Sequence, residues 1–253
     1  VQTLHDVDLE EYYTEYSYNV SKSPLVKNFM KVFANNIWNK YDLSEGDLVV
    51  DVGSSDGFQL SLFQNLGAKV IGFEPSESLS KISNSRGIET VSDIFDSKSL
   101  NLILQKADNG ARVILTQYTF DHIPEPSEFL INVSKVLDPK KGLLVIEVHD
   151  FAKIVERREA CLFTHEHATY TSEKSISSIF ENFGFKLLST NLVPESARRG
   201  NSMIVVASLK ESNMIPDKTL FSDSLEMLNS KETYVSFAKE VLDSHNRFRE
   251  NLK

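Results

Sequence analysis

Short apolar runs and longer amphipathic stretches alternate through the middle of the chain. The apolar runs are rich in Val, Ile and Leu and predict buried strands at residues 48–50, 69–73, 88–91, 112–116 and 143–148. Apolar positions at helical spacing, with glycine or proline stops, predict helices at about 24–40, 58–66, 76–86 and 127–137. Strands that alternate with helices in this way predict an α/β fold with a parallel, doubly wound sheet.

The pattern changes after the fifth predicted strand. Residues 171–183 predict a further helix, which Gly184 ends, and residues 185–192 and 202–209 predict two more strands that form a hairpin-like pair. Residues 232–252 predict a long amphipathic helix that needs a partner surface, either this domain or the seam of a homodimer.

These elements divide the chain into three parts. Residues 1–40 form a tyrosine-rich segment and a helix, residues 41–210 the α/β domain, and residues 211–253 a helical extension. The length suits one domain with extensions and allows a sizeable core.

The chain is organised around residues 48–60, which predict a strand, a tight glycine turn and the start of a helix. The turn and its flanks consist of Asp51, Gly53, Ser54, Ser55, Asp56, Gly57 and Phe58. A turn of this kind brings backbone N–H groups and a helix N-terminus close to a ligand, because the glycines carry no Cβ. The same pattern also occurs as a purely structural connection between a strand and a helix.

The turn departs from the dinucleotide fingerprint G-x-G-x-x-G. Its pattern is D-x-G-x-x-x-G, and Ser55 stands where a second glycine would let a pyrophosphate approach. Asp51, at the strand end, suits a ligand with an ammonium group better than one with a pyrophosphate. The turn resembles motif I of the class I S-adenosylmethionine (SAM)-dependent methyltransferases, and an NAD-dependent oxidoreductase is the alternative that these two residues disfavour.

Polar residues stand at the ends of four predicted strands. They are Asp51, Glu74, Gln117 and His149. The carboxyl ends of parallel strands meet at one edge of a doubly wound sheet, where its ligand binds. Glu74 lies about 20 residues beyond the glycine turn, in the position that accepts hydrogen bonds from ribose hydroxyls, and Pro75 prevents the strand from continuing.

A dense group of titratable residues follows the fifth strand. His165, Glu166 and His167 are adjacent in a predicted loop near the same edge. A histidine suits general base chemistry near neutral pH, and a neighbouring carboxylate can orient it. Two imidazoles and a carboxylate could also ligate a metal, but residues one and two apart need not converge and the H-E-x-x-H spacing is absent, so we predict no metal. A solvated or helix-capping cluster is the remaining alternative.

Two other groups of residues have both a structural and a functional interpretation. The rings of Tyr12, Tyr13, Tyr16 and Tyr18 would either pack on the domain surface or form a lid over the substrate. The pairs Arg157-Arg158 and Arg198-Arg199 would either be solvated or bind the phosphates of a nucleotide-linked substrate through guanidinium forks.

Composition and charge narrow the class of protein. The net charge of −9 argues against a general nucleic-acid or membrane-surface binder. The single cysteine, Cys161, excludes a disulfide framework or a cysteine-rich zinc site within these residues. There is no apolar stretch long enough for a signal sequence or a membrane span, so we expect a cytoplasmic protein with a small-molecule substrate.

Five motifs in order extend the resemblance. DVGSSDGFQL, GFEPS, TQYTFDHIPEP, LLVIEVHD and FTHEHATYTS resemble the sugar C-methyltransferases that act on nucleotide-linked deoxysugars, whose members carry D-V-G-S-N-D-G, G-x-E-P-S, N-x-x-x-H-I-P and Y-H-E-H. The resemblance covers roughly residues 12–209 and implies a Rossmann-like class I methyltransferase sheet, mostly parallel with its last strand antiparallel.

The resemblance also implies roles for individual residues. SAM would be held by Asp51, Gly53, Ser54, Ser55, Gly57, Phe58, Glu74, Pro75, Asp93, Ile94, Gln117 and His122, with Asp93 and Ile94 at the adenine. His167 would be the base, supported by Glu166 and His165. The substrate would contact Tyr16, Tyr18, His149, Arg198 and Arg199. His122 lies in the matching loop of the family, so the resemblance implies that it also faces the substrate.

The chain departs from the family at several points. Thr164 replaces the tyrosine before H-E-H, and the H-G-G-S-x-R segment appears as R-G-N-S-M-I at residues 199–204. The family's cysteine-rich zinc domain and its C-terminal α/β domain are not among these residues. The sequence therefore predicts a SAM-dependent methyltransferase of a sugar or other small polar acceptor, by C- or O-methylation, with a non-catalytic methyltransferase-like module as a further alternative.

Overall fold

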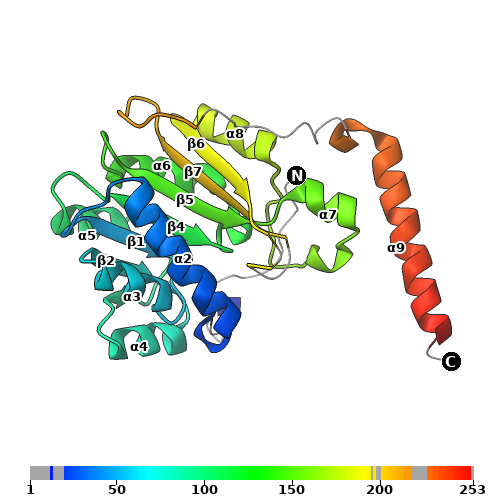
Figure 1. The fold of residues 1–253 in the computed structure, drawn as a ribbon, viewed down its shortest axis with the longest axis horizontal. Helices are drawn as coiled ribbons and strands as arrows, with labels where there is room; N and C mark the ends of the chain where they lie inside the picture. Colours follow the sequence, from blue (N-terminus) through cyan, green and yellow to red (C-terminus); the bar gives the residue numbers. More distant parts are fainter. Residues whose placement is uncertain (1–11, 14–19, 195, 198–200, 218–226, 252–253) are drawn as a thin grey trace.

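A seven-stranded sheet with helices on both faces forms the body of the protein (Figure 1). The computed structural model describes residues 12–13, 20–194, 196–197, 201–217 and 227–251. The strands are β1 (Leu48–Val52), β2 (Lys69–Phe73), β3 (Thr90–Val91), β4 (Val113–Gln117), β5 (Leu143–Val148), β6 (Phe185–Leu192) and β7 (Met203–Leu209). The helices are α2 (Pro24–Lys40), α3 (Phe58–Asn65), α4 (Glu77–Ser85), α5 (Ser99–Lys106), α6 (Pro126–Val136), α7 (Phe151–Arg157), α8 (Glu173–Asn182) and α9 (Lys231–Asn251).

The strand order confirms the predicted fold class. It is β3-β2-β1-β4-β5-β7-β6. The pairs from β3 to β5 are parallel, and β7 runs antiparallel to both of its neighbours, β5 and β6. This is the mostly parallel Rossmann-like sheet with an antiparallel last strand that the motifs implied. The order reverses between β1 and β4, which is where ligands bind in sheets of this kind.

The core lies in two layers, one on each face of the sheet. Because strand side chains alternate, Val50 and its neighbours two residues away belong to the layer that includes residues of α5, α6 and α8, whereas Val49 belongs to the layer with α2 and α3. Both layers consist of fully buried aliphatic and aromatic side chains. The central strands are therefore held from both sides, which fixes the position of their polar carboxyl ends.

Local signals set several helix boundaries as predicted. Ser23 caps α2 by accepting a hydrogen bond from the Val26 N–H, and Pro24 is the first helical residue. Ser172 caps α8 in a capping box with Ser175. The short third strand begins two residues later than predicted, at Thr90, and the prediction missed α5 and α7.

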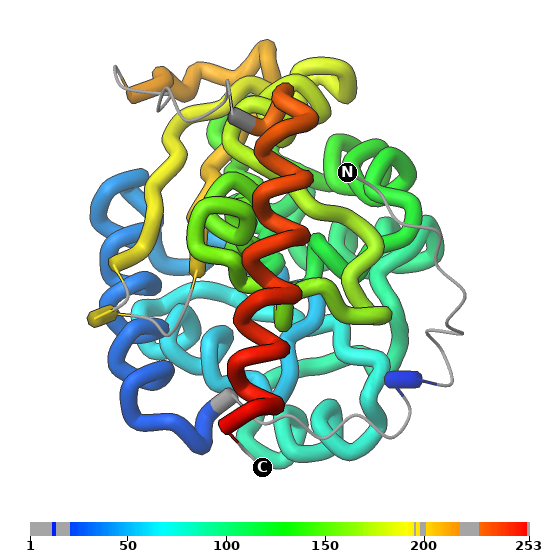
Figure 2. The backbone as a smooth tube through the Cα atoms, turned by 90° about the vertical axis from the view of Figure 1, so that its right-hand side faces the viewer, coloured from blue at the N-terminus to red at the C-terminus, as the bar shows by residue number. Residues whose placement is uncertain are grey.

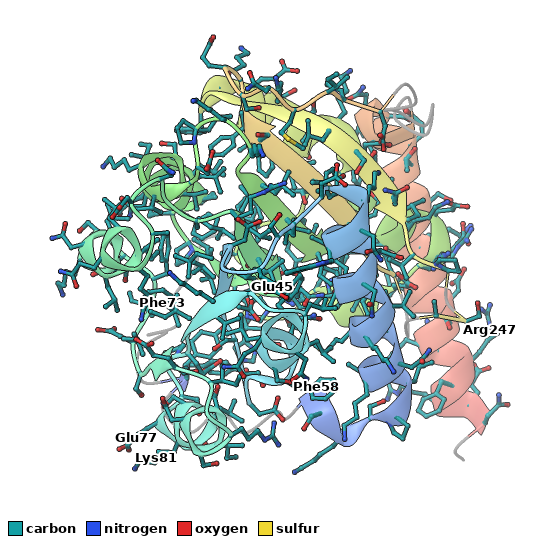
Figure 3. The ribbon with its side chains drawn as sticks, turned by 60° about the vertical axis from the view of Figure 1, so that its left-hand side comes forward. Glu45, Phe58, Phe73, Glu77, Lys81 and Arg247 are labelled. Atoms are coloured by element: carbon teal, nitrogen blue, oxygen red, sulfur yellow. The ribbon has the colours of Figure 1, made fainter. Side chains whose placement is uncertain are left out.

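The β1–α3 turn depends on its glycines. Gly53 and Gly57 have φ angles of +77° and +73°. A Cβ on Gly53 would lie 2.2 Å from Thr119 Oγ1, so this glycine lets the turn approach the loop after β4. Phe58 opens α3 and faces α2, where the Lys27 Nζ lies 5.5 Å from its ring centroid (Figure 3).

Helix α9 lies beside the body of the protein and packs on it over only part of its length (Figure 1). Its contacts are with α7 and the short helix at residues 160–162, through Tyr234, Phe237 and an ion pair between Glu240 and Arg158. Figure 2 shows the helix running along this side of the molecule, and Figure 3 labels Arg247 on its distal half. Within the described residues, no helix combines the length and apolar character needed to cross a membrane.

Candidate active site at the carboxyl edge of the sheet

The polar strand ends predicted from the sequence do gather at one edge of the sheet. Asp51 in β1 pairs in register with Gly72 of β2 and Leu115 of β4, and Gln117 ends β4 opposite Glu147 of β5. The structure brings these ends to the switch point between β1 and β4, so the edge has the topology of a ligand site.

Asp51 is a buried carboxyl group with a free acceptor. Its side chain is 3% exposed, and among the described residues its Oδ1 atom has no hydrogen-bond partner. Burial, together with the nearby charge of Glu74, raises the pKa of Asp51 well above its usual value. A cationic group from a ligand would relieve both effects, which fits the prediction of an ammonium contact.

Glu74 binds the backbone of the turn. Its Oε2 accepts a hydrogen bond from the Ser55 N–H at 2.8 Å, and its Oε1 accepts one from the Ser76 N–H at 2.9 Å. Burial raises the pKa of Glu74 even though these two hydrogen bonds oppose the shift. Each oxygen keeps a second lone pair, so Glu74 can order the turn and still accept a ribose hydroxyl.

The rest of the turn divides into ligand-facing and structural residues. Ser54 Oγ is buried and lacks a hydrogen-bond partner among the described residues, and Ser55 takes a φ of +49°. Asp56 has a structural role instead, because its fully buried carboxylate pairs with Arg86 at 2.8 Å and accepts a hydrogen bond from Ser21. The N–H groups of Gly53 and Ser54 donate to the Phe73 carbonyl, and that of Ser55 donates to Glu74, so the end of β2 orders the turn.

The predicted adenine contacts lie on the surface after β3. Asp93 and Ile94 are exposed, and the Asp93 Oδ1 accepts a hydrogen bond from the Ile94 N–H. Phe95, the third residue of this segment, instead packs edge-to-face against Phe73 and Phe129. A bound adenine ring would have to lie over these exposed side chains to contact them.

Gln117 also presents a free acceptor. Its Nε2 donates to Glu147 Oε2 at 2.7 Å, while its Oε1 is buried without a hydrogen-bond partner among the described residues. Glu147 is fully buried and also accepts a hydrogen bond from Ser202 at 2.7 Å. The sequence analysis did not single out Glu147, although a charged residue inside the apolar strand L-L-V-I-E-V was a visible signal.

Asp121 is the centre of a histidine cluster that the sequence analysis missed. Its Oδ2 lies 3.2 Å from His149 Nδ1 and 3.9 Å from His167 Nε2, and its Oδ1 lies 3.8 Å from His122 Nε2. Burial alone would raise the pKa of Asp121, but the hydrogen bond with His149 and the charges of the three histidines bring it below its usual value. The carboxylate therefore stays ionised. The pKa of His122 is nevertheless lowered, because burial outweighs the opposing charge of Asp121.

His167 is held in a defined orientation. Its Nδ1 lies 2.9 Å from the backbone carbonyl oxygen of Leu162, so the ring donates its Nδ1–H there and directs Nε2 toward Asp121. The carbonyl of Asp121 in turn accepts hydrogen bonds from the N–H groups of Ala168 and Thr169. These contacts tie the loop of His167 to the loop after β4.

The other two members of the H-E-H triplet point elsewhere. His165 is exposed, with its ring 5.7 Å from that of Tyr12. Glu166 accepts a hydrogen bond from the Tyr12 hydroxyl at 2.6 Å, and this bond is the main reason that the pKa of Tyr12 rises to about 12. Only His167 joins the cluster around Asp121, so the three neighbours in sequence do not act on one point.

The tyrosine-rich segment reaches the same region. Tyr13 hydrogen-bonds to His122 Nδ1 and stacks on its ring.

The remaining predicted site residues lie in different places. Pro75 is partly exposed beside Glu74, and the ring centroid of His149 lies 4.8 Å from that of Tyr118. The predicted substrate contacts Tyr16, Tyr18, Arg198 and Arg199 lie outside the described residues. Arg158, from the other arginine pair, is used in the ion pair with α9.

Comparison with known proteins gives a consistent picture. A family model described as a methyltransferase domain matches residues 27–190. The chain is 28% identical over 204 residues to the C-methyltransferase NovU of Streptomyces niveus, which is 81% of this chain and 47% of NovU. The chain thus spans about half the length of this curated relative.

Solved structures share the fold at low identity. Magnesium protoporphyrin IX methyltransferase from Synechocystis PCC 6803, with bound SAH, has a TM-score of 0.56 and 17% identity, covering 79% of this chain and 91% of that chain. A Haloferax volcanii methyltransferase complex with the activator Trm112 gives a TM-score of 0.55 at 14% identity, covering 71% and 97%.

Proposed function

The chain belongs to the methyltransferase-domain family, and we propose that it transfers the methyl group of SAM to a small polar acceptor, with His167 as the general base. The acceptor that we propose is a sugar or a nucleotide-linked sugar, in cytoplasmic sugar biosynthesis. The observation that carries the proposal is the fixed His167 ring, whose Nε2 is directed to the sheet edge that also holds the acceptors of Asp51 and Gln117.

The residues of the edge fit SAM. Asp51 Oδ1 offers a buried acceptor to its ammonium group, and Gly53 lets the turn pack closely against Thr119 in the loop after β4. Gln117 Oε1 is a second buried acceptor for the methionine end, and Glu74 and Asp93 would meet the ribose and the adenine. When bound, SAM supplies an electrophilic methyl group for in-line displacement.

The protein's own contribution is alignment and proton removal. His167 Nε2 takes a proton from the acceptor, while the Nδ1–H bond to Leu162 keeps the ring in place. The imidazolium that forms lies 3.9 Å from the ionised Asp121, which stabilises it. A C–H next to a ketone would give C-methylation and a hydroxyl would give O-methylation. Positioning accounts for a large share of the acceleration in either case.

Two observations support a sugar-type acceptor. The curated relative at 28% identity is named a C-methyltransferase, which supports methylation at carbon, and the polar groups near His167 are of the kind that bind the hydroxyls of a sugar. The ring centroids of His122 and His149 lie 5.0 and 5.4 Å from that of His167. We also propose that Glu166, Tyr16, Tyr18, Arg198 and Arg199 contribute contacts to the acceptor. We also propose that α9 mediates a homodimer.

Mass spectrometry of candidate acceptors in heavy water tests the function. Nucleotide-linked keto-sugars and ordinary sugars are incubated with the enzyme, with and without SAM. We expect one added methyl group on an acceptor. For a keto-sugar, we also expect proton-for-deuterium exchange without SAM that is lost in His167→Gln and retained in His245→Gln, an exposed histidine of α9. Exchange and transfer that survive in His167→Gln would refute its role as the base, and methylation without exchange would indicate a hydroxyl acceptor.

A further inference from the structure

Asp121, His149 and His167 come together from three different segments of the chain. They lie in the loop after β4, directly after β5 and in the loop before α8. One potential ligand atom from each residue lies within 4.8 Å of the other two. Oδ2 of Asp121 is 3.2 Å from His149 Nδ1 and 3.9 Å from His167 Nε2. Shifts of less than about 1 Å would place all three atoms ~2.0–2.2 Å from one common point, which is the bond length from zinc to its ligands.

Two of the three side chains are buried, His149 is partly buried, and surrounding contacts hold the site. Asp121 is 4% exposed and His167 is 7% exposed. The Nδ1–H of His167 is directed to the Leu162 carbonyl, which is the outer contact that typically orients a metal-ligating histidine. The backbone carbonyl of Asp121 is held by two N–H groups. The site is therefore preorganised by its surroundings.

Asp121 supplies a second observation that points to a ligand. Its Oδ2 atom faces His149 and His167, while its Oδ1 atom is buried 3.8 Å from His122 Nε2 and has no hydrogen-bond partner among the described residues. An ionised carboxylate with a free acceptor is costly inside a protein unless it meets a cation. The two nitrogen ligands and one oxygen ligand favour a borderline transition metal such as Zn²⁺ over Mg²⁺ or Ca²⁺, which prefer oxygen ligands.

We propose that Asp121, His149 and His167 form a binding site for a divalent transition-metal ion such as Zn²⁺. Asp121 would bind through a carboxylate oxygen, His167 through Nε2, and His149 through Nδ1 with its proton on Nε2. Three protein ligands leave a fourth position open to water or another ligand. The spacing of residues 165–167 predicts no metal, and of these three residues His167 alone belongs to the proposed site.

The site has a consequence that rests on the proposed function. The Nε2 lone pair of His167 can bind either a metal ion or the proton of the acceptor, but not both at once. We therefore expect Zn²⁺ to inhibit methyl transfer and a chelator to restore it. Activation by Zn²⁺ would refute this competition.

Direct binding of Zn²⁺ tests the site without any assay of activity. Isothermal titration calorimetry of the metal-free protein with zinc chloride should give one saturable site. Asp121→Asn and His149→Gln should each weaken it by more than the about 10–100-fold that loss of an outer contact costs. His165→Gln, which changes an exposed histidine of the same loop, should keep the wild-type affinity.

A second measurement covers variants that fail to fold. Cobalt chloride added to the wild-type protein should give the visible absorption of Co²⁺ bound at a one-to-one ratio, and Zn²⁺ should displace it. Absence of saturable Zn²⁺ binding and of this absorption in the wild-type protein would overturn the site. Equal weakening in His165→Gln and in the two ligand variants would also overturn it. A protein that binds Zn²⁺ as expected but transfers no methyl group would refute the proposed function alone.

Discussion

Two buried carboxyl groups, Asp51 and Asp121, lie at the same edge of the sheet and differ in their surroundings. Burial and the neighbouring Glu74 raise the pKa of Asp51, whereas three histidines lower the pKa of Asp121. Environments that separate the pKa values of like groups commonly separate their roles. Asp51 is suited to pair with a cation that arrives with the ligand, and Asp121 already faces potential cations of the protein.

The raised pKa of Asp51 leads to a prediction for cofactor binding. A ligand ammonium group favours the ionised carboxylate, so binding lowers this pKa and releases a proton at a pH below the raised value. The affinity for S-adenosylhomocysteine should then rise with pH, by up to about tenfold per pH unit, until the pH exceeds the pKa of the free protein. Calorimetric titrations with S-adenosylhomocysteine measure this dependence. They would run from about pH 5 to about pH 8, where native proteins are ordinarily stable.

Asp51→Asn should lower the affinity and remove most of the pH dependence, because the amide does not titrate. Glu77→Gln, which changes an exposed carboxylate at the start of α4, is the matched control and should retain both. A wild-type affinity that does not change with pH would contradict the pairing of Asp51 with the ligand's ammonium group.

At the scale of single residues, the sequence located the strand ends but not their partners. Asp51, Glu74, Gln117 and His149 follow apolar runs, and a parallel sheet places such residues on one edge. The role of Asp121 could not be predicted because it depends on how three loops meet, and no spacing in the sequence reports that. For the same reason, the closeness of His165 to His167 in the sequence did not predict the direction in which the His165 side chain points.

At the scale of elements, long periodic segments were predictable, and short helices were predictable only where a turn signal marks their start, as the glycine turn does for α3. The sequence predicted α2, α8 and the central strands, whose apolar faces are continuous. It missed α5 and α7, which have eight and seven residues. Helices this short are marginal on their own, so packing against the sheet decides whether they form.

The β1–α3 turn gives a prediction about an element. Gly53→Ala should destabilise the protein more than Gly87→Ala, because both positions have a positive φ but only Gly53 faces a neighbour. The left-handed conformation costs an alanine about 1–2 kcal/mol at either site. The contact with the β-branched Thr119 adds about 1–3 kcal/mol at Gly53. Urea denaturation monitored by circular dichroism measures both losses, and equal losses would show that the turn tolerates a Cβ.

At the scale of the whole molecule, α9 is the element least integrated into the fold. Tyr234 and Phe237 pack against α7 and its neighbouring turn, but every described residue from Leu242 onward is exposed. Tyr234, Val241 and Phe248 are spaced by seven residues and share one stripe of the helix. The stripe therefore continues beyond the surface of the body that covers its first half.

We expect a second copy of the chain to cover the exposed half of this stripe in a two-fold symmetric contact. Phe248, which is 62% exposed, would then be buried in the dimer. Phe248→Ser should shift the protein toward the monomer in sedimentation-velocity experiments over a range of concentrations. Val235→Ser is the matched control, because Val235 is 59% exposed but lies on another side of the helix. A monomeric wild-type protein, or equal effects of the two substitutions, would show that α9 has a different role.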